Sequence, residues 1–320
     1  MGEMMGTFGV VFPGQGSQYP GMGQDLYRRS QKVRELFATA GEVLGRDMAS
    51  LCFEGPQEAL DLTANTQIAV LIADLAAWLA FSERATKAPA ILAGHSLGEY
   101  AALYAAGAVG LRDVLTLVDL RGKYHQEAVP VGEGAMAAIL GLSKAAVEEL
   151  CRGIDREKNV VTLSIENAPG KIVVSGHRLA IDEIIAAAET REGGRGVKLP
   201  ISVPCHSPLL QAAADRFAAE LEKVDFGDCG IPVIPNCSPG LLHSREKTRE
   251  LLARQITSPV GWKETIERMA AMGIDTVVEL GPKRTLSGLI RRIDRKLRLL
   301  NVEDGESLEK TVAELNNSAP

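Results

Sequence analysis

The chain has 320 residues, 46% of them hydrophobic, and a formal net charge of -6 at pH 7. This length and composition predict a soluble globular protein with a large core, built as one α/β body that carries an insertion. The negative charge argues against a general nucleic-acid binder, and the longest apolar stretch, 68–81, contains Asp74 and is too short to cross a membrane.

The first part of the chain predicts strands that alternate with helices, because short apolar runs are separated by longer runs with helical periodicity. A turn rich in small residues, 13–17, ends the first strand. This alternation is typical of a mostly parallel sheet whose faces are covered by helices. Strands are predicted at 8–12 and 89–93, and helices at 26–44, 67–81, 97–106 and 111–128.

A different order of predicted elements begins near Val129, namely strand, helix, strand, strand, helix, strand. This order is the ferredoxin-like pattern. We therefore expect an inserted ferredoxin-like subdomain over 129–203, within a larger body formed by 1–128 and 204–320. Its strands are predicted at 134–141, 160–165, 171–175 and 196–203, and its helices at 144–151 and 179–190. Beyond it, helices are predicted at 209–221, 247–255 and 262–272, and a strand at 276–280.

Ser96 lies in the sequence Gly94-His95-Ser96-Leu97-Gly98, between a predicted strand and a predicted helix. A Gly-x-Ser-x-Gly turn in this context holds the serine on a tight elbow with its hydroxyl exposed above the sheet. The N–H groups and dipole at the start of the helix would stabilise the negative charge of a tetrahedral acyl intermediate. Ser96 is therefore a candidate nucleophile, and the alternative is an ordinary N-capping serine. Glu99 suits the first helical turn through the same dipole.

A serine nucleophile needs a base, and histidine has a suitable pKa. His206 follows an apolar strand at the junction of the two predicted subdomains, where clefts form. It is therefore the candidate base, and the alternative is a hydrogen-bonded interior histidine. His95 should point away from its neighbour Ser96. Cys205 is a rival nucleophile, but successive side chains on extended backbone diverge, so its thiol cannot easily use His206 as a base. We therefore expect Cys205 to have a packing role. The remaining histidines lie late in a helix or in polar loops: His125, His177 and His243.

Arg121 continues the apolar stripe of the 111–128 helix, in step with Val114 and Val118. An arginine on an inward face needs an anion, because an unpaired buried charge is strongly destabilising. That anion is either a structural Asp or Glu, or a substrate carboxylate gripped by the guanidinium fork with Gly122 leaving room beside it.

Metal and dinucleotide sites find no support in the sequence. The five cysteines form no Cys-x-x-Cys pair, which argues against both a zinc site and a disulfide framework. Gly14-Gln15-Gly16 is not completed to a dinucleotide motif. Residues 1–6 do not resemble an export signal, so the cytoplasm is the expected location.

Basic residues gather between 283 and 298, where Asp294 is the single acid. The simplest interpretation of this basic stripe is a solvated helix face. The alternative is a surface that docks an acidic partner.

Five segments, taken in chain order, resemble the malonyl-CoA:acyl carrier protein transacylase family. They are Phe-Pro-Gly-Gln-Gly-Ser-Gln at 12–18, Gly-His-Ser-Leu-Gly-Glu-Tyr at 94–100, Leu-Arg-Gly-Lys at 120–123, Val-Pro-Cys-His at 203–206 and Gln-Ile-Thr-Ser-Pro-Val at 255–260. The similarity runs from about residue 8 to residue 301. The resemblance implies an α/β-hydrolase-like large subdomain with a mostly parallel sheet, plus the ferredoxin-like insertion. It also implies ping-pong acyl transfer from coenzyme A to the phosphopantetheine thiol of a carrier protein, with no permanently bound cofactor.

The resemblance assigns roles to residues that match the family motifs. Ser96 becomes the nucleophile, His206 the base and Arg121 the clamp for the malonyl carboxylate. The backbone N–H groups of Gln15 and Leu97 become the oxyanion hole.

Two further residues match positions near the family's site. Gln255 stands where the family orients the histidine through a main-chain carbonyl, so the resemblance requires no acidic third member of a triad. Asn167 matches a family asparagine, although the preceding Ile165 and Glu166 depart from the common pattern.

By family expectation the carrier protein is acidic, so an acidic enzyme needs a local basic docking surface. The candidates are Arg195, Lys198, Arg291 and Arg292. The sequence at 203–206 favours fatty-acid synthesis, and the nearest alternative is a discrete acyltransferase of a polyketide synthase. A thioesterase is disfavoured by Arg121 and by the lack of a candidate acid between Ser96 and His206. Because these three residues are intact, a noncatalytic scaffold is also disfavoured.

Overall fold

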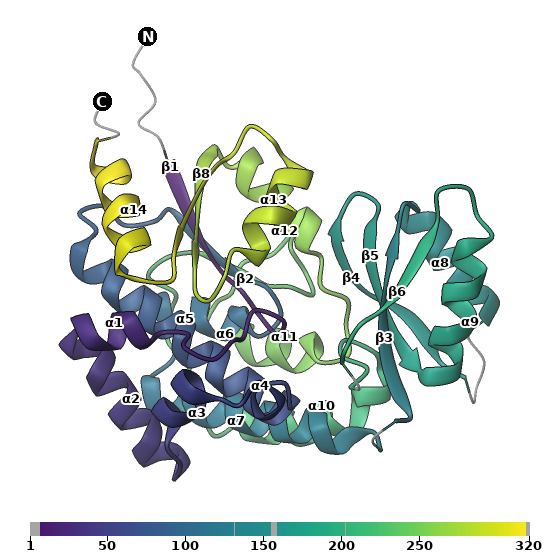
Figure 1. Ribbon diagram of the computed structural model, residues 1–320, viewed down its shortest axis with the longest axis horizontal. Helices are drawn as coiled ribbons and strands as arrows, with labels where there is room; N and C mark the ends of the chain where they lie inside the picture. Colours follow the sequence, from purple (N-terminus) through teal and green to yellow (C-terminus); the bar gives the residue numbers. More distant parts are fainter. Residues whose placement is uncertain (1–6, 131, 155–158, 202, 318–320) are drawn as a thin grey trace.

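The computed structural model describes residues 7–317 except 131, 155–158 and 202. The expectation that residues 1–6 carry no export signal lies outside the described residues. Two sheets organise the molecule, one parallel and one antiparallel, as Figure 1 shows. The predicted α/β architecture with a ferredoxin-like insertion is confirmed.

The parallel sheet has five strands in the order β7-β2-β1-β8-β9. Apart from the edge strand β9, its strands are almost fully buried, as expected for a parallel sheet covered by helices. Phe12, the last residue of β1, pairs with Gly94, the last residue of β2. The turn after β1 and the elbow after β2 therefore emerge side by side at the carboxyl edge of the sheet, where α/β folds bind ligands. The bounds are β1 Thr7–Phe12, β2 Ile91–Gly94, β7 Val233–Ile234, β8 Ile274–Leu280 and β9 Arg298–Val302.

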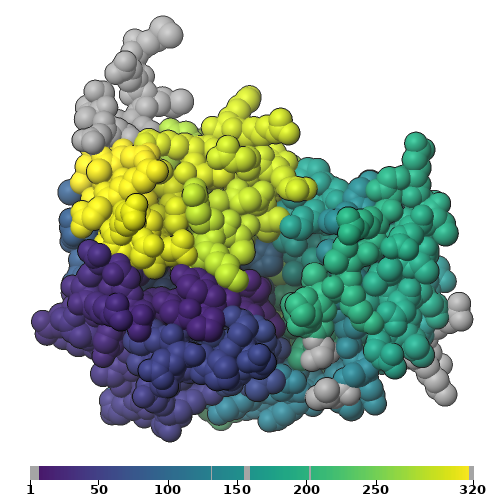
Figure 2. Space-filling view, viewed as in Figure 1, coloured from purple at the N-terminus to yellow at the C-terminus, as the bar shows by residue number. Residues whose placement is uncertain are grey.

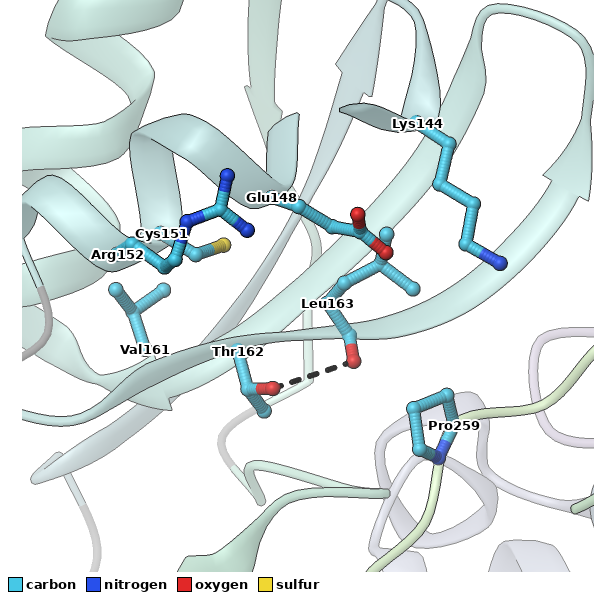
Figure 3. A pocket seen from close by; sticks show the side chains of 8 residues that line it. All are labelled: Lys144, Glu148, Cys151, Arg152, Val161, Thr162, Leu163 and Pro259. Atoms are coloured by element: carbon cyan, nitrogen blue, oxygen red, sulfur yellow. Dashed lines mark hydrogen bonds between the residues drawn. The ribbon is translucent and has the colours of Figure 1, made fainter. Parts of the chain in front are cut away.

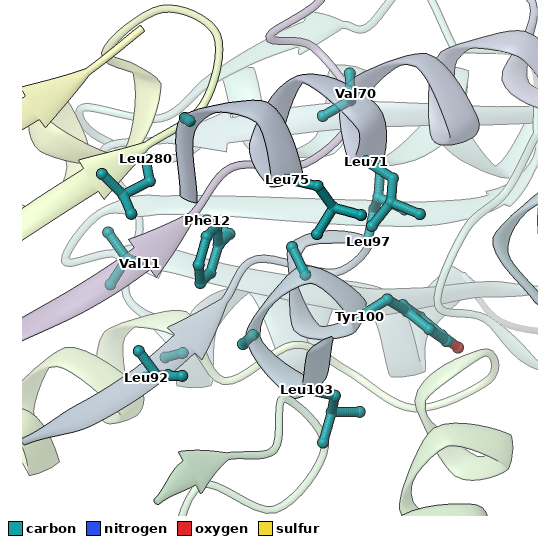
Figure 4. Packing of buried hydrophobic residues seen from close by; sticks show 14 of the residues in the cluster. Val11, Phe12, Val70, Leu71, Leu75, Leu92, Leu97, Tyr100, Leu103 and Leu280 are labelled. Carbon is teal, nitrogen blue, oxygen red and sulfur yellow. The ribbon is translucent and has the colours of Figure 1, made fainter. Parts of the chain in front are cut away.

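Helices cover both faces of this sheet. The central one is α5, and Figure 4 shows its Leu71 and Leu75 in one cluster with Phe12 of β1 and Leu103 of α6. By length and composition α5 could cross a membrane, but 78% of its apolar window is buried inside the molecule, so it is the buried core helix that 67–81 predicts. The helices of the large subdomain are α1 Gln24–Arg29, α2 Gln31–Leu44, α3 Met48–Glu54, α4 Gln57–Leu60, α5 Thr63–Arg84, α6 Gly98–Ala105, α7 Leu111–Ala128, η1 Pro208–Leu210, α10 Gln211–Leu221, α11 Thr248–Gln255, α12 Trp262–Ala271, α13 Thr285–Ile293 and α14 Gly305–Asn317.

The insertion has a four-stranded antiparallel sheet in the order β4-β5-β3-β6. It follows the predicted chain order and encloses a core of its own. In Figure 2 it forms a separate lobe, coloured teal and green, beside the large subdomain. Its elements are β3 Gly134–Leu140, α8 Lys144–Ile154, β4 Val161–Ala168, β5 Lys171–His177, α9 Arg178–Glu189 and β6 Arg195–Lys198.

The edge strand β4 joins the two subdomains. Val260, in the loop after α11, donates its N–H to Ser164 O at 2.9 Å and accepts from Glu166 N at 3.0 Å. This parallel bridge fixes the end of β4 against the large subdomain. It thereby brings Asn167 toward the carboxyl edge of the parallel sheet.

Three sequence expectations need correction. The helix predicted at 26–44 is two helices, because Ser30 breaks it and caps α2 by accepting a hydrogen bond from Val33 N. The strand predicted at 196–203 ends at Lys198, since Pro200 has no N–H to extend the ladder; residue 202 lies outside the described residues. The basic stripe is not one helix face, because only Arg291 and Arg292 lie on α13 and its other members lie in turns or on β9.

Candidate active site

Ser96 lies in the turn between β2 and α6 with a left-handed φ of 53°. Such a conformation costs a non-glycine residue about 1–3 kcal/mol, so the surroundings must hold it. The flanking glycines are required by close backbone approaches. A Cβ on Gly94 would overlap the backbone of Gly98, and a Cβ on Gly98 would overlap the carbonyl oxygen of Phe12. The Gly-x-Ser-x-Gly pattern is therefore the elbow that its sequence predicts.

His206 lies directly against the serine. Its Nε2 is 2.7 Å from Ser96 Oγ, and its Nδ1 is 2.8 Å from the main-chain oxygen of Gln255. A carbonyl oxygen can only accept, so Nδ1 carries the proton and Nε2 is free to accept the hydroxyl hydrogen. Burial, together with the nearby charge of Arg121, lowers the pKa of His206 to about 3. The imidazole is therefore neutral at pH 7, as a general base must be.

Arg121 is 1% exposed and points inward from α7, as the helical stripe predicts. Its Nη1 donates to Gln67 Oε1 at 2.6 Å, and its Nη2 donates to Gln255 Oε1 at 3.0 Å and to Ser96 Oγ at 3.3 Å. All three acceptors are neutral. Within the described residues no carboxylate forms an ion pair with Arg121. The alternative of a structural Asp or Glu partner is thus not found in this part of the chain, and the cation faces the hydroxyl of Ser96.

The expectation that Gly122 leaves room for a substrate is wrong. A Cβ there would lie 3.1 Å from Ala64 Cα and 3.3 Å from the Thr63 carbonyl oxygen. Gly122 therefore permits close packing of α7 against α5, on a side where the neighbouring backbone fills the space.

The main-chain N–H groups of Leu97 and Gln15 lie in the elbow and in the neighbouring turn. The two turns are in contact, because a Cβ on Gly14 would overlap the carbonyl oxygen of His95. The hydroxyl of Ser17 donates to Gly14 O at 2.8 Å and fixes the first turn. Neither the Leu97 nor the Gln15 N–H has a hydrogen-bond partner among residues 7–317 as described above. Both donors are therefore available to a ligand.

His95 points away from Ser96, as expected. Its Nε2 lies 2.9 Å from Asn167 Oδ1, and its ring meets Trp262 edge to face. Asn167 therefore reaches the elbow from β4 and contacts it through His95. The neighbouring Glu166 makes an ion pair with Lys144 at 3.1 Å.

Cys205 packs in the core, as predicted. Its thiol lies 4.0 Å from Nδ1 of His125, and burial raises the pKa of Cys205 to about 11. The thiol is therefore a poor nucleophile at neutral pH. His125 is also buried and accepts a hydrogen bond from Gln67 Nε2 at 3.2 Å.

Sequence reasoning missed four polar residues around the site. Gln67 and Asn236 were not singled out, Glu99 was interpreted only through the helix dipole, and His243 was placed in a polar loop. All are at most 5% exposed. A signal existed for Gln67, a long polar side chain in an otherwise apolar helix. The contacts that join the others to the site span more than 130 residues, as for Glu99 with Asn236 and His243, so no local pattern indicates this role.

The four basic docking candidates are exposed but do not form one cluster. Arg195 and Lys198 lie on β6, and Lys198 makes an ion pair with Asp182 at 2.7 Å. Arg291 and Arg292 lie on α13, which packs against β4 at the opposite edge of the antiparallel sheet. With Gly288 and Arg295 they line a surface cavity of about 610 Å³.

A further cavity of about 330 Å³ lies on the insertion, between α8 and β4 (Figure 3). It contains neither Ser96 nor His206. The cavity is lined by Lys144, Glu148, Cys151, Arg152, Val161, Thr162, Leu163 and Pro259.

Among the residues with described positions, no group of three or more His, Cys, Asp or Glu side chains could hold a metal ion.

Known proteins resemble this chain over nearly its whole length. A family model described as the acyl transferase domain matches residues 9–309. The malonyl CoA-acyl carrier protein transacylase of Bacillus subtilis is 39% identical over 318 residues, which are 98% of this chain and 100% of the relative.

Solved structures are equally similar. That of the malonyl CoA-acyl carrier protein transacylase from Coxiella burnetii is 41% identical, with a TM-score of 0.94 over 98% of this chain and 99% of the other. A malonyl transacylase in complex with a type II polyketide synthase acyl carrier protein is 40% identical, with a TM-score of 0.93 over 96% of this chain and 99% of the other. The chain therefore belongs to the acyl transferase family and, within it, to the malonyl-CoA:acyl carrier protein transacylases.

Proposed function

We propose that this enzyme transfers the malonyl group from malonyl-CoA to the phosphopantetheine thiol of holo acyl carrier protein, through a malonyl-Ser96 intermediate. The observation that carries the proposal is the buried guanidinium of Arg121, which has only neutral partners and lies 3.3 Å from Ser96 Oγ. A cation placed there suits an acyl group that ends in a carboxylate.

In the loading step, Nε2 of His206 takes the hydroxyl proton as Ser96 Oγ attacks the thioester carbonyl carbon. The N–H groups of Leu97 and Gln15 hold the resulting oxyanion. The carbon–sulfur bond then breaks, and His206 returns the proton to the departing coenzyme A thiolate. The products are the malonyl-Ser96 ester and free coenzyme A.

In the transfer step the same groups act in reverse. His206 takes the proton of the phosphopantetheine thiol, and the sulfur attacks the malonyl-Ser96 ester. The carbon–oxygen bond breaks, and His206 reprotonates Ser96. Because Nδ1 of His206 is held by the carbonyl of Gln255 at 2.8 Å, the imidazole keeps the tautomer that both steps need.

We further propose that Arg121 both selects the malonyl group and holds it away from water. A carboxylate paired with the buried guanidinium fixes the acyl chain relative to the ester carbonyl. Hydrolysis then competes poorly with the incoming thiol. Gln255 shapes this site through its side-chain carbonyl, and Asn167 supports the elbow from the insertion through its contact with His95.

For the carrier protein we propose a docking surface built from Arg195 and Lys198 on β6 and from Arg291 and Arg292 on α13. These side chains are exposed, and an acidic partner would be attracted by their charge. We place the insertion at 129–203, between 1–128 and 204–320. We also propose that the enzyme works in the cytoplasm without a permanently bound cofactor, and that it supplies fatty-acid synthesis.

A second candidate is a discrete acyltransferase of a polyketide synthase. It is favoured by the similarity to the transacylase solved with a type II polyketide synthase carrier, at 40% identity. The chemistry at Ser96 would be the same. The two candidates differ only in the carrier protein that accepts the malonyl group.

The experiment follows radiolabelled malonyl-CoA with and without holo carrier protein. Without carrier we expect label on Ser96, and with carrier we expect label on the phosphopantetheine thiol. The Ser96→Ala variant should bind no label covalently. Label released into water would indicate a thioesterase, and no label on the enzyme would indicate a noncatalytic scaffold. Carriers from fatty-acid and polyketide systems, compared at equal concentration, separate the two candidates.

A further inference from the structure

Glu99 lies three residues after the nucleophile and is fully buried. We propose that it is a positioning residue: it fixes the side-chain amide of Gln255 so that the amide oxygen faces Arg121 and the amide nitrogen faces the Ser96 carbonyl. The inference rests on the proposed function, since its consequence is a preference for malonyl over neutral acyl groups.

Both oxygens of Glu99 make hydrogen bonds with residues distant in the chain. Its Oε2 accepts from Gln255 Nε2 at 2.7 Å and from Asn236 N at 3.0 Å. Its Oε1 lies 2.7 Å from Nε2 of His243. Glu99 does not touch His206 in these contacts, so it is not the acid of a catalytic triad. It acts through Gln255.

The chemistry of Glu99 sets the orientation of the Gln255 amide. The oxygen facing Gln255 can only accept, so the NH₂ group must point toward it. The amide oxygen then points the other way, where it accepts from Arg121 Nη2 at 3.0 Å. The flipped amide would set its NH₂ group against the guanidinium, donor against donor, and leave buried groups unpaired.

Glu99 does not neutralise the charge of Arg121, because it forms an overall neutral pair with its neighbour His243. The hydroxyl of Thr248 donates to Ser244 O at 2.8 Å, so its oxygen must accept from His243 Nδ1 at 3.1 Å. Since Nδ1 carries a hydrogen, one further proton is shared between His243 Nε2 and Glu99 Oε1. With that proton on either atom, the Glu99–His243 pair is neutral overall. Glu99 can therefore orient Gln255 without neutralising the cation.

The same network holds the peptide groups on either side of the nucleophile. Gln255 Nε2 donates to the Ser96 carbonyl at 2.9 Å, and Ser96 N donates to Asn236 Oδ1 at 2.5 Å. Asn236 is held in turn by its own N–H bond to Glu99. Through Gln255 and Asn236, Glu99 therefore helps to hold the peptide groups on both sides of Ser96, whose φ is 53°.

Two variants separate positioning from charge. In Glu99→Gln the side-chain oxygen can still accept from Gln255, while its NH₂ group donates to Nε2 of neutral His243. In Glu99→Asp the negative charge remains, but the carboxylate retreats by one methylene from Gln255. Positioning predicts that the Gln variant keeps the malonyl preference and the Asp variant loses it, whereas a charge effect predicts the reverse.

The measurement is kcat/KM for acylation of Ser96 by malonyl-CoA and by acetyl-CoA. We expect the malonyl-to-acetyl ratio of Glu99→Asp and Glu99→Leu to fall about 10-fold to 100-fold, mainly through a higher KM for malonyl-CoA, as for a misplaced contact group. Glu99→Gln should stay within about 3-fold of the parent, since its hydrogen bonds are preserved. The control is Leu103→Ala, which weakens the same helix without touching the network and should keep the parent ratio.

A fall in the malonyl-to-acetyl ratio in Glu99→Gln but not in Glu99→Asp would overturn the inference. An unchanged ratio in all three Glu99 variants would also overturn it. Equal losses toward both thioesters would also reject it, because they indicate general collapse of the elbow. If Glu99→Leu does not fold, the comparison of the Gln and Asp variants stands alone. Failure of the proposed function is distinguishable, since the parent enzyme itself would then show no malonyl preference.

Discussion

Nη2 of Arg121 lies 3.3 Å from Oγ of Ser96, so a buried cation and the candidate nucleophile share one small space. The other partners of the guanidinium, Gln67 and Gln255, are neutral amides that orient it without cancelling its charge. A buried charge with such partners is destabilising unless a ligand pairs with it. This relationship explains why the site would favour an acyl group that brings its own carboxylate.

Replacing Arg121 by Ala should remove most of the malonyl preference. The expected loss is about 2 to 5 kcal/mol in malonyl over acetyl discrimination, as for a broken desolvated charge pair. Competing acylation of Ser96 by malonyl-CoA and acetyl-CoA measures it. The matched control is Arg112→Ala, an exposed arginine on the same helix, which should change nothing. A variant at 121 that still favours malonyl-CoA as strongly as the parent would disprove the clamp.

The pH at which Ser96 loses its reactivity on the acid side should reflect the low pKa of His206. Burial and the charge of Arg121 lower this pKa to about 3, and an imidazole can act as the proposed base only when it is deprotonated. Sulfonylation of Ser96 by a neutral sulfonyl fluoride should therefore stay fast as the pH falls through 6.5, the usual histidine value, and decline only at more acidic pH. In Arg121→Ala the decline in rate should occur at a higher pH, since the charge that lowers the pKa of His206 is gone. A decline centred near the usual histidine pKa in the parent enzyme would contradict this prediction.

The local parts of the site could be predicted from the sequence. The elbow depends on residues within a few positions of Ser96, and the inward direction of Arg121 follows from the helical step that it shares with Val118. Each depends on one element and its period. The sequence also predicts that His95 turns away from its neighbour, because adjacent side chains diverge.

Contacts between distant segments could not be predicted. Glu99 is held by Asn236 and His243, which both lie in the connection between β7 and α11, far from Glu99 in the chain. Gly122 packs against α5 because two helices cross there, whereas its neighbour Arg121 suggested a role in binding. Boundaries failed where one residue outweighed the periodicity, as at Ser30 and Pro200.

Substitution by Ala should have opposite effects at a glycine in a close backbone contact and at a glycine on an open helix surface. At Gly94 a Cβ would overlap the Gly98 backbone, so Gly94→Ala should unfold the elbow and abolish labelling of Ser96. At Gly288, on α13, a Cβ meets open space. Gly288→Ala should therefore raise the free energy of unfolding by about 0.5–1 kcal/mol and leave loading from malonyl-CoA unchanged. Denaturant unfolding together with Ser96 labelling tests both variants, and normal labelling in Gly94→Ala would refute the packing argument.

Charge reversal on the proposed docking surface should affect the carrier protein alone. Arg195→Glu on β6 and Arg292→Glu on α13 should each raise the KM for holo carrier protein, while the KM for malonyl-CoA stays constant. Because the two elements lie at opposite edges of the antiparallel sheet, they would contact different parts of the carrier, and the effects should add in the double variant.

Salt provides an independent check on the same surface, because interactions between exposed charges weaken as ionic strength rises. The KM of the parent for carrier should increase with salt, and that of the double variant should respond less. Lys32→Glu on α2, far from the insertion in Figure 1, is the control and should behave as the parent. An equal rise in KM for carrier and for malonyl-CoA would mean that these arginines act on the acyl site, and the docking surface would have to lie elsewhere.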